Sequence, residues 1–461
     1  MADIVLTGDT SGAITIAAPA VAGTNTITLP ATTGKITVNS TGGVDSNTGL
    51  GDGTFDANTT GGNNTAVGKS SMGANTTGDK NVAVGQGALD ANTTADFNTA
   101  VGSDALGLNT TGEDNTAIGK NAIESNTTGS SNTAVGKGAL GANTTGTINT
   151  AVGRDALSSN TTATGNTAVG REALTANTTG TSNTSVGTSS LMSNTTGTLN
   201  TAVGISALKD ATTAEYNVAV GKEAGANLTT GSYNSVLGTQ ALRDATTAAS
   251  SVAIGTSALQ LCVTGTLNTA VGSNCLTSTT GNNNAAIGYA SGNANTSGSQ
   301  NTFLGRSAGG NITTGSNNTA IGYDSSSSSA TVSNEFTLGN GSIGAIRCNT
   351  TSISSLSDAR DKTNVQDIPL GLDFVNQMRP VSFDWDRRDG SYKGKKDFGF
   401  IAQELKEIQD NTEYADHLRL VRENNPEKLE ATPMNTYPVL VKAIQELSAK
   451  VEELENKLQG N

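Results

Sequence analysis

Apolar residues along most of the chain recur with a fixed spacing of 17 residues. The repeating unit reads approximately N-T-A-V-G-x-x-A-L-x-x-N-T-T-G-x-x, and the glycine that closes N-T-A-V-G marks the phase of each copy. These glycines are Gly68, Gly85, Gly102, Gly119, Gly136, Gly153, Gly170, Gly187, Gly204, Gly221, Gly238, Gly255, Gly272, Gly288, Gly305 and Gly322. The spacing is 17 residues throughout, except for one step of 16 before Gly288. Such a period predicts a repeat protein in which each copy stacks on the next.

Three segments of the unit have different patterns. Thr-Ala-Val alternates small and β-branched residues, which predicts a short strand whose two faces meet different surroundings. The Ala-Leu segment predicts a second short strand. Asn-Thr-Thr-Gly predicts a turn, because asparagine can bond its own backbone and glycine accepts positive φ. We therefore expect a mainly β fold, a parallel β-solenoid or β-roll with one coil per unit. The N-T-T triplets match a glycosylation sequon, but their fixed phase favours stacked turn residues.

Two apolar columns are expected to run along the coils. One contains Val67, Val84, Val101, Ile118, Val135 and Val152, and the other contains Met72, Leu89, Leu106, Ile123, Leu140 and Leu157. Two medium-sized apolar side chains per coil bury little surface, while ordering each residue costs on the order of 1 to 2 kcal/mol. A lone stack of coils is therefore expected to be marginally stable, and association of several chains would offset this.

The pattern changes at both ends of the repeats. Residues 1–44 contain the alternating runs ITI, TITL and KITV and predict a separate small β segment. Residues 45–322 hold the repeats, and residues 323–356 predict a β neck with short strands at EFTLGN and GAIRCN. Residues 357–461 predict a small α/β domain. In it IPLGLDFVNQM is expected as a helix, VSFDWD and LRLV as strands, FGFIAQELKEI as a strand running into a helix, and the chain from Tyr437 as a long helix.

The last helix carries an apolar stripe with alternating spacings of four and three residues. Its members are Leu440, Ile444, Leu447, Val451, Leu454 and Leu458. This spacing predicts a coiled-coil seam, with glutamate and lysine on the other faces of the helix. The alternative is that the stripe packs on its own domain.

Composition and charge exclude several classes of function. Hydrophobic residues make up 34% of the chain and aromatic residues 3%, which argues against a single large apolar core. The net charge of -13 excludes nucleic acid as a partner, because that interaction needs a basic face. No apolar run approaches the roughly 20 residues that span a bilayer, so we expect no membrane insertion. The opening MADIVLTGDTSG lacks the basic flank of a secretory signal, so we expect synthesis in the cytoplasm without one.

The chain contains few residues that bind metals. Cys262, Cys275 and Cys348 form no CxxC pair and are expected to be unpaired thiols. His417 is the only histidine and has no cysteine or histidine nearby in the sequence. We expect no metal site and no cofactor.

Four motifs near the C-terminus carry a resemblance to a known family. They are SDARDKTNV (357–365), RPVSFDW (379–385), GFIAQEL (399–405) and YPVLVKAIQEL (437–447). Over residues 357–461 the chain resembles the C-terminal intramolecular chaperone of phage tailspikes and tail fibres, the endosialidase-type self-cleaving serine peptidases. The resemblance implies a homotrimer and a domain that helps an extended β-stalk to fold. It also implies that the chain cuts itself between Leu356 and Ser357.

The same resemblance implies a catalytic pair. Ser357 would be the nucleophile and Lys362 its base, with Asp358 and Arg360 at the remaining charged positions of the motif. A lysine accepts the serine proton only if desolvation or nearby positive charge favours its neutral form, and Arg360 could supply that charge. Five residues subtend about 500° on a helix and leave two side chains about 140° apart, so a turn or a neighbouring chain's lysine is required. The alternative is that Ser357 caps a helix or turn and that Asp358 and Arg360 are solvated charges.

The repeats carry a second resemblance. NTAVG, and SVAIG at residues 251–255, resemble the signature of the left-handed parallel β-roll in the heads of trimeric autotransporter adhesins, which also implies a trimer. Together these features predict a phage tail fibre or tailspike, a structural adhesin of the virion tail. It would contact other tail proteins through residues 1–44 and a host-surface glycan or protein through the repeats, with no enzyme activity beyond single-turnover self-cleavage.

Two other functions stay open at this point. A polysaccharide depolymerase would need a positioned pair of carboxylates, and no position of the repeat carries an acid in every copy. A cellular trimeric surface adhesin would need an export signal.

Overall fold

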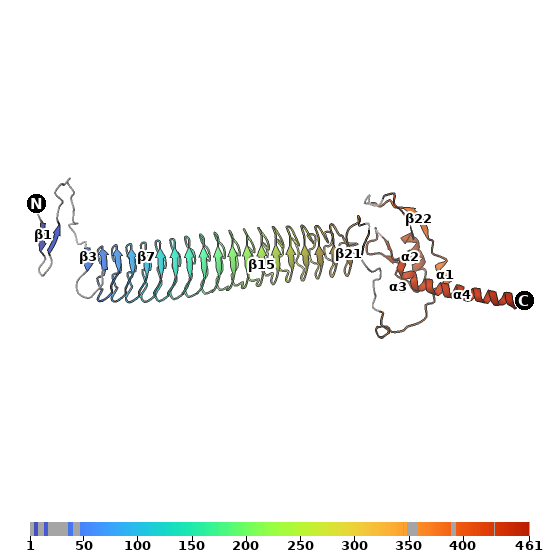
Figure 1. Ribbon diagram of the computed structural model, residues 1–461, viewed down its shortest axis with the longest axis horizontal. Helices are drawn as coiled ribbons and strands as arrows, with labels where there is room; N and C mark the ends of the chain where they lie inside the picture. The colour runs from blue at the N-terminus through green and yellow to red at the C-terminus, as the bar shows by residue number, and fades with distance from the viewer. Residues whose placement is uncertain are drawn as a thin grey trace. The chain divides into compact units, whose positions relative to one another are not determined.

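The computed structural model describes residues 4–7, 13–16, 36–39, 47–343, 345–347, 357–388, 393–427 and 429–460. The chain divides into two units, Met1–Asn132 and Thr133–Asn461. Each unit contains part of the repeat region, visible as successive short strands in Figure 1.

The first unit begins with antiparallel strands. β1 (Ile4–Thr7) pairs with β2 (Ala13–Ile16), and β3 (Ile36–Asn39) pairs with β4 (Asn47–Leu50). β2 contains the predicted ITI run and β3 contains the Ile-Thr-Val of KITV, whereas Lys35 and TITL lie outside the described residues. From β4 onward the pairing is parallel through β5 (Thr65–Val67), β6 (Val82–Val84), β7 (Thr99–Val101) and β8 (Thr116–Ile118).

The second unit continues with a parallel ladder of thirteen strands in its described residues. They are β9 (Thr133–Val135), β10 (Thr150–Val152), β11 (Thr167–Val169), β12 (Thr184–Val186), β13 (Thr201–Val203), β14 (Val218–Val220), β15 (Ser235–Leu237), β16 (Val252–Ile254), β17 (Thr269–Val271), β18 (Ala285–Ile287), β19 (Thr302–Leu304), β20 (Thr319–Ile321) and β21 (Phe336–Leu338). Each residue pairs with the residue of the same phase in the next coil, as Thr150 does with Thr167. The predicted parallel β-solenoid with 17-residue coils is confirmed. The predicted neck strand EFTLGN contains β21, which joins this ladder, whereas Ala345–Arg347 of GAIRCN is not a strand.

The prediction of a second strand at Ala-Leu is wrong. Each coil turns at this leucine, which adopts a left-handed backbone with φ of 52° at Leu89 and 51° at Leu106. Such a conformation is uncommon for leucine, so the sequence pattern does not reveal it. The side chain is nevertheless fully buried, and its contacts inside the coil offset the backbone cost.

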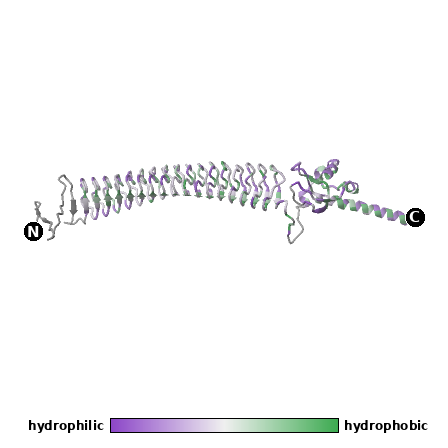
Figure 2. Ribbon diagram, turned by 90° about the horizontal axis from the view of Figure 1, so that it is seen from above, coloured by the Kyte–Doolittle hydropathy of each residue, from purple (hydrophilic) through white to green (hydrophobic). Residues whose placement is uncertain are grey.

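Only one of the two predicted apolar columns lies inside the coils. Leu89, Leu106 and their equivalents are fully buried, together with the central alanine of each strand, such as Ala100. The other column points outward, and Val84 and Ile118 are 36% and 41% exposed. A three-residue strand turns its central side chain to one face and its two outer side chains to the other. Alanine takes the inner place, so the valine column stays on the surface. Figure 2 shows this hydropathy pattern recurring from coil to coil.

Buried asparagines form two ladders between the coils. In one, the Asn92 Nδ2 donates to the Asn75 Oδ1 at 2.9 Å and to the Ala95 carbonyl of its own coil at 3.1 Å. In the other, the Asn81 backbone N–H donates to the Asn64 Oδ1 at 2.8 Å. A buried amide stabilises only when its donors and acceptors are paired, and the 17-residue period supplies a partner wherever the adjacent coil also carries the asparagine.

The first ladder explains the N-T-T triplets. Their asparagine side chains are buried and hydrogen-bonded, which confirms the prediction of stacked turn residues over glycan acceptors. Where Ala211 replaces the asparagine, the Asn194 Oδ1 of the preceding coil has no hydrogen-bond partner among the described residues. The ladder is therefore interrupted at that coil.

Removing one rung elsewhere is expected to be costly. Asn92→Ala deletes the donor to the Asn75 Oδ1 and the acceptor of the Asn109 Nδ2. We expect it to lower the free energy of unfolding by about 2–3 kcal/mol, because each buried polar group left unpaired costs about 1–3 kcal/mol. Thr94→Ala is the matched control, because it removes the same sequon at an exposed side chain. Denaturant unfolding of both variants measures the difference, and equal stabilities would contradict the role of the ladder.

The C-terminal part of the second unit is the predicted small α/β domain. Its helices are α1 (Leu372–Val375), α2 (Ala402–Asp410), α3 (Ala415–Leu418) and α4 (Tyr437–Gln459), with short 3-10 turns at η1 (Ala359–Asp361) and η2 (Pro433–Thr436). Its strands are β22 (Val381–Asp384), antiparallel to β23 (Lys396–Gly399), and the two-residue pair β24 (Val421–Arg422) and β25 (Glu430–Ala431). The predicted first helix exists but is shorter than expected. The prediction of LRLV as a strand is largely wrong, because Leu418 ends α3, Arg419 has a left-handed backbone and only Val421 lies in β24.

A small apolar cluster holds this domain together. Its buried members are Phe374, Met378, Leu405, Leu418, Leu420, Val421 and Val439. Two polar contacts join elements that are distant in the sequence: the Glu446 carboxylate accepts the Leu372 N–H at 2.8 Å, and Gln409 Oε1 accepts the Leu420 N–H at 2.6 Å. The first contact satisfies an N–H group at the start of α1, which has no acceptor within the helix.

Candidate active site

The segment from Ser357 to Lys362 folds as one tight turn. Asp358 precedes the 3-10 turn η1, and its Oδ1 accepts the Arg360 backbone N–H at 2.9 Å. The Lys362 N–H donates to the Ala359 carbonyl at 3.2 Å, and Lys362 itself returns to extended backbone with φ of -121°. An aspartate at this position is a favourable cap, because its carboxylate pairs with a backbone N–H that the turn leaves free.

This turn brings the predicted serine and lysine together. The Lys362 Nζ lies 2.5 Å from the Ser357 Oγ and 3.3 Å from the Ser357 carbonyl oxygen. A regular helix could not do this, and the predicted need for a turn within the chain or a lysine from a neighbour is met here by the turn. The distance lies within the reach that a base needs to accept the hydroxyl proton. Both residues are exposed.

The capping alternative applies to Asp358 and not to Ser357. The side chain that caps the turn is that of Asp358, whereas the Ser357 hydroxyl contacts the lysine amine. The arrangement is therefore compatible with Ser357 as a nucleophile, and the catalytic roles of the pair stay a prediction.

Arg360 pairs with Asp358, although it was expected to supply positive charge near Lys362. Its guanidinium binds the Asp358 carboxylate, with Nε 3.1 Å from each oxygen and Nη2 2.5 Å from Oδ2. Arg360 holds the pKa of the Asp358 carboxyl below its usual value through these hydrogen bonds, and the pairing raises the pKa of Arg360. The arginine charge is thus balanced by a carboxylate, so the pair braces the turn instead of supplying free positive charge to Lys362. The predicted scissile bond begins at Leu356, which lies outside the described residues.

The other motifs supply a framework for the domain. Arg379 of RPVSFDW forms an ion pair with Glu404 of GFIAQEL, with its Nε 3.1 Å from the Glu404 Oε2. Sequence reasoning did not predict this pair or the contact of Glu446 with Leu372. Both depend on how distant segments pack, and no local spacing indicates them.

The predicted seam of α4 is largely exposed in the single chain. Val439 and Ala443 pack into the domain, and Leu440 is half-buried. The following positions Ile444, Leu447, Val451, Leu454 and Leu458 are 46–78% exposed. The stripe therefore does not pack on its own domain beyond Leu440, and coiled-coil pairing through it stays a prediction.

Two of the cysteines are core residues of the repeats. Cys262 and Cys275 are free and buried, and they occupy phases that carry asparagine and alanine in other coils. Burial raises the pKa of the Cys262 thiol to about 11 and that of Cys275 to about 12. Their predicted state as unpaired thiols is confirmed, whereas Cys348 lies outside the described residues.

These raised pKa values predict a stability that depends on pH. An unfolded thiol ionises near its ordinary pKa of 9.0, while the folded thiols stay neutral to about pH 11. Because the unfolded state loses its protons first, the free energy of unfolding is expected to fall as the pH rises from 9 towards 12. Denaturant unfolding at pH 8 and pH 10 tests this. Replacing Cys262 and Cys275 with alanine should make the decline shallower, and an unchanged slope would contradict the assignment.

Neither a metal centre nor a membrane-spanning helix is present in the described part of the chain. None of the helices there combines the length and apolar character needed to cross a bilayer. Among the same residues, no three His, Cys, Asp or Glu side chains gather as metal ligands would.

Comparison with known proteins gives one match, and it begins at the candidate nucleophile. Residues 357–414 match the family described as "Chaperone of endosialidase". The match covers η1, α1, β22, β23 and α2, and therefore includes Ser357, Lys362 and the Arg379–Glu404 pair. No curated protein and no solved structure matches the chain.

Proposed function

We propose that this chain is a trimeric phage tail fibre or tailspike that attaches to the host surface. Residues 357–461 act as its folding chaperone and then cut themselves off before Ser357. The observation that carries the proposal is the coincidence of three features. A parallel β-solenoid precedes the match to the endosialidase chaperone, the match starts at Ser357, and a turn places Lys362 Nζ 2.5 Å from the Ser357 hydroxyl.

A chaperone of this kind suits the energetics of the repeats. Parallel β coils pair residues that are distant in sequence, so they form slowly and expose unpaired edges while incomplete. A domain that holds several chains side by side lets the coils start in the same register. The exposed seam of α4 supports this role, because it offers an apolar surface for chain association before the coils are complete.

The chemistry would run as an acyl transfer within the chain. Lys362 accepts the Ser357 proton as the hydroxyl attacks the carbonyl carbon of Leu356, and the peptide nitrogen of Ser357 leaves with a proton from the lysine. Water then releases the ester that joins the Leu356 carbonyl to the Ser357 oxygen, which frees both fragments. Desolvation favours the neutral, basic form of a lysine, and Lys362 is exposed in the single chain. We therefore place cleavage after chains associate.

Truncation tests the chaperone role. A chain ending at Leu356 is expected to accumulate as insoluble material, whereas full-length Ser357→Ala should stay soluble and trimeric by light scattering. The alanine variant retains the domain and lacks only the hydroxyl, so it separates folding assistance from cleavage. A soluble trimer formed by residues 1–356 expressed alone would refute the chaperone role.

A further inference from the structure

The outward side of the strands is an uncharged surface with exposed apolar side chains in both units. We call it the valine face, formed by the first and third residues of each strand from β5 to β21. Its exposed apolar members include Val82, Val84 and Ile118 in the first unit and Val135, Val169, Val218, Leu237, Ile254, Ile287, Leu304, Phe336 and Leu338 in the second. Their exposed fractions run from 36% to 65%.

The chemistry of this face hardly changes from coil to coil. The third strand position is valine, isoleucine or leucine in every strand from β5 to β21, and the first is threonine, valine, serine, alanine or phenylalanine. No charged residue occupies either position. A neighbouring exposed position, directly after the glycine, behaves differently. Along the chain it holds lysine, glutamine, serine, arginine, threonine, isoleucine and tyrosine.

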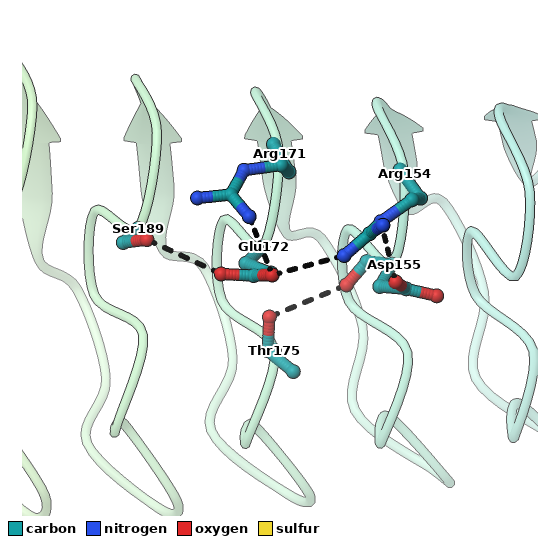
Figure 3. A network of polar contacts seen from close by, with 6 residues as sticks. All are labelled: Arg154, Asp155, Arg171, Glu172, Thr175 and Ser189. Atoms are coloured by element: carbon teal, nitrogen blue, oxygen red, sulfur yellow. Dashed lines mark hydrogen bonds and ion pairs between the residues drawn. The ribbon is translucent and has the colours of Figure 1, made fainter.

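Some charged side chains beside this face pair with one another within the chain. Figure 3 shows Arg154 and Arg171 on the position after the glycine, both bound to Glu172, while Arg154 also pairs with Asp155. These side chains point to solvent and balance one another between adjacent coils. The valine face carries no charge, its polar members are threonine and serine, and its third position is apolar in every strand from β5 to β21. An extended surface with exposed apolar side chains at successive coils marks an interaction site. Its uniformity over the coils indicates that it is covered along its length.

We propose that the valine face of each chain packs against the same faces of two other copies, which run parallel and in register. The face carries equivalent side chains at every coil, about 4.8 Å apart. A partner that fits all of them needs the same spacing and direction, and a second copy of this chain has both. Because the chain carries a net charge of -13, copies repel one another least where this uncharged face meets its equivalents.

The size of the face suits such an assembly. In the second unit the thirteen strands give a surface about 60 Å long and about 10 Å wide, from the usual strand spacing and rise. That area of about 600 Å² per chain approaches the roughly 800 Å² per partner of stable protein interfaces. Covering it would supply the burial that the thin interior of each coil lacks.

Site-specific cross-linking of the full chain tests the proposal, which rests on the proposed homotrimer. Ile118→Cys places a thiol on the valine face, and Leu108→Cys places one at an exposed leucine seven residues beyond the end of β7. Both variants carry Cys348→Ser, and the buried Cys262 and Cys275 keep raised pKa values and should not react. Light scattering first measures the mass of the native protein in solution. A short bismaleimide is then added, and denaturing gels show which chains are cross-linked.

Different results would contradict the homotrimer and the valine-face interface. Cross-linking of the Ile118→Cys chains into species larger than one chain, with Leu108→Cys remaining uncross-linked, is the expected result. A trimer in solution whose Leu108→Cys variant cross-links as well as or better than Ile118→Cys would overturn the valine face and leave the homotrimer standing. A chain that light scattering shows to be monomeric would overturn the homotrimer and this interface together.

Discussion

Lys362→Met is expected to stop cleavage of the chain. The substitution removes the amine that lies 2.5 Å from the Ser357 Oγ and keeps a side chain of similar length. Loss of a general base slows a reaction by about 10²- to 10⁴-fold, so the precursor should persist over the time in which the wild type is fully cut. The measurement is the fraction of full-length chain on denaturing gels at successive times after expression.

A matched control distinguishes the loss of the base from the loss of one positive charge in the domain. Lys457→Met removes a lysine of the same domain at the exposed end of α4, where it pairs with Glu453. This variant should cleave at the wild-type rate. Asp358→Asn should cleave more slowly than wild type but faster than Lys362→Met, because it loses charge pairing with Arg360 and keeps an acceptor for the backbone N–H. Normal cleavage by Lys362→Met would remove this lysine from the mechanism.

Gly102→Ala is expected to have the largest effect on the stability of the repeats. Gly102 has φ of +137°, and a Cβ there would lie 2.5 Å from the Gly119 carbonyl oxygen of the next coil. Backbone strain and a clash with backbone that cannot move without breaking the ladder act together. We expect a loss of about 3–5 kcal/mol in the free energy of unfolding, measured by denaturant or thermal unfolding.

Gly107→Ala in the same coil is the control for this substitution. Gly107 has no left-handed backbone, and its Cβ would lie 3.3 Å from the nearest atom, the Asp104 carbonyl oxygen. Its stability should change by less than about 1 kcal/mol, since Gly→Ala at a compatible position also reduces the entropy of the unfolded chain. Equal stability of the two variants would contradict the prediction that Gly102 and its equivalents must be glycine for the coils to stack this closely.

The repeat period predicted the stacking of the coils, but not their internal geometry. Thr-Ala-Val forms one three-residue strand in each coil. Within it, the Ala100 side chain lies on the opposite face of the strand from those of Thr99 and Val101. Which side of the strand faces inward depends on how the return segment packs, and the sequence pattern does not contain that information. The left-handed turn at Leu106 was missed for a similar reason. It is stabilised by burial inside the coil and not by the residue's own preference.

In the candidate site, the spacing of residues in the sequence predicted the contacts between residues that are close in the sequence. The five-residue separation of Ser357 and Lys362 required a turn or a neighbouring chain's lysine, and the structure contains the turn. The position of Arg360 was not predictable in this way, because a flexible arginine two residues from an aspartate can either pair with it or point elsewhere. Contacts between distant segments, such as Arg379 with Glu404, require the fold itself.

The intact masses of the purified products show whether the chain cuts itself immediately before Ser357. We expect two fragments from the wild type, one ending at Leu356 and one comprising residues 357–461 with Ser357 at its N-terminus. From Ser357→Ala we expect a single uncut chain of 46.2 kDa. A wild-type chain that stays at 46.2 kDa, or a fragment that begins at any other residue, would contradict the claim.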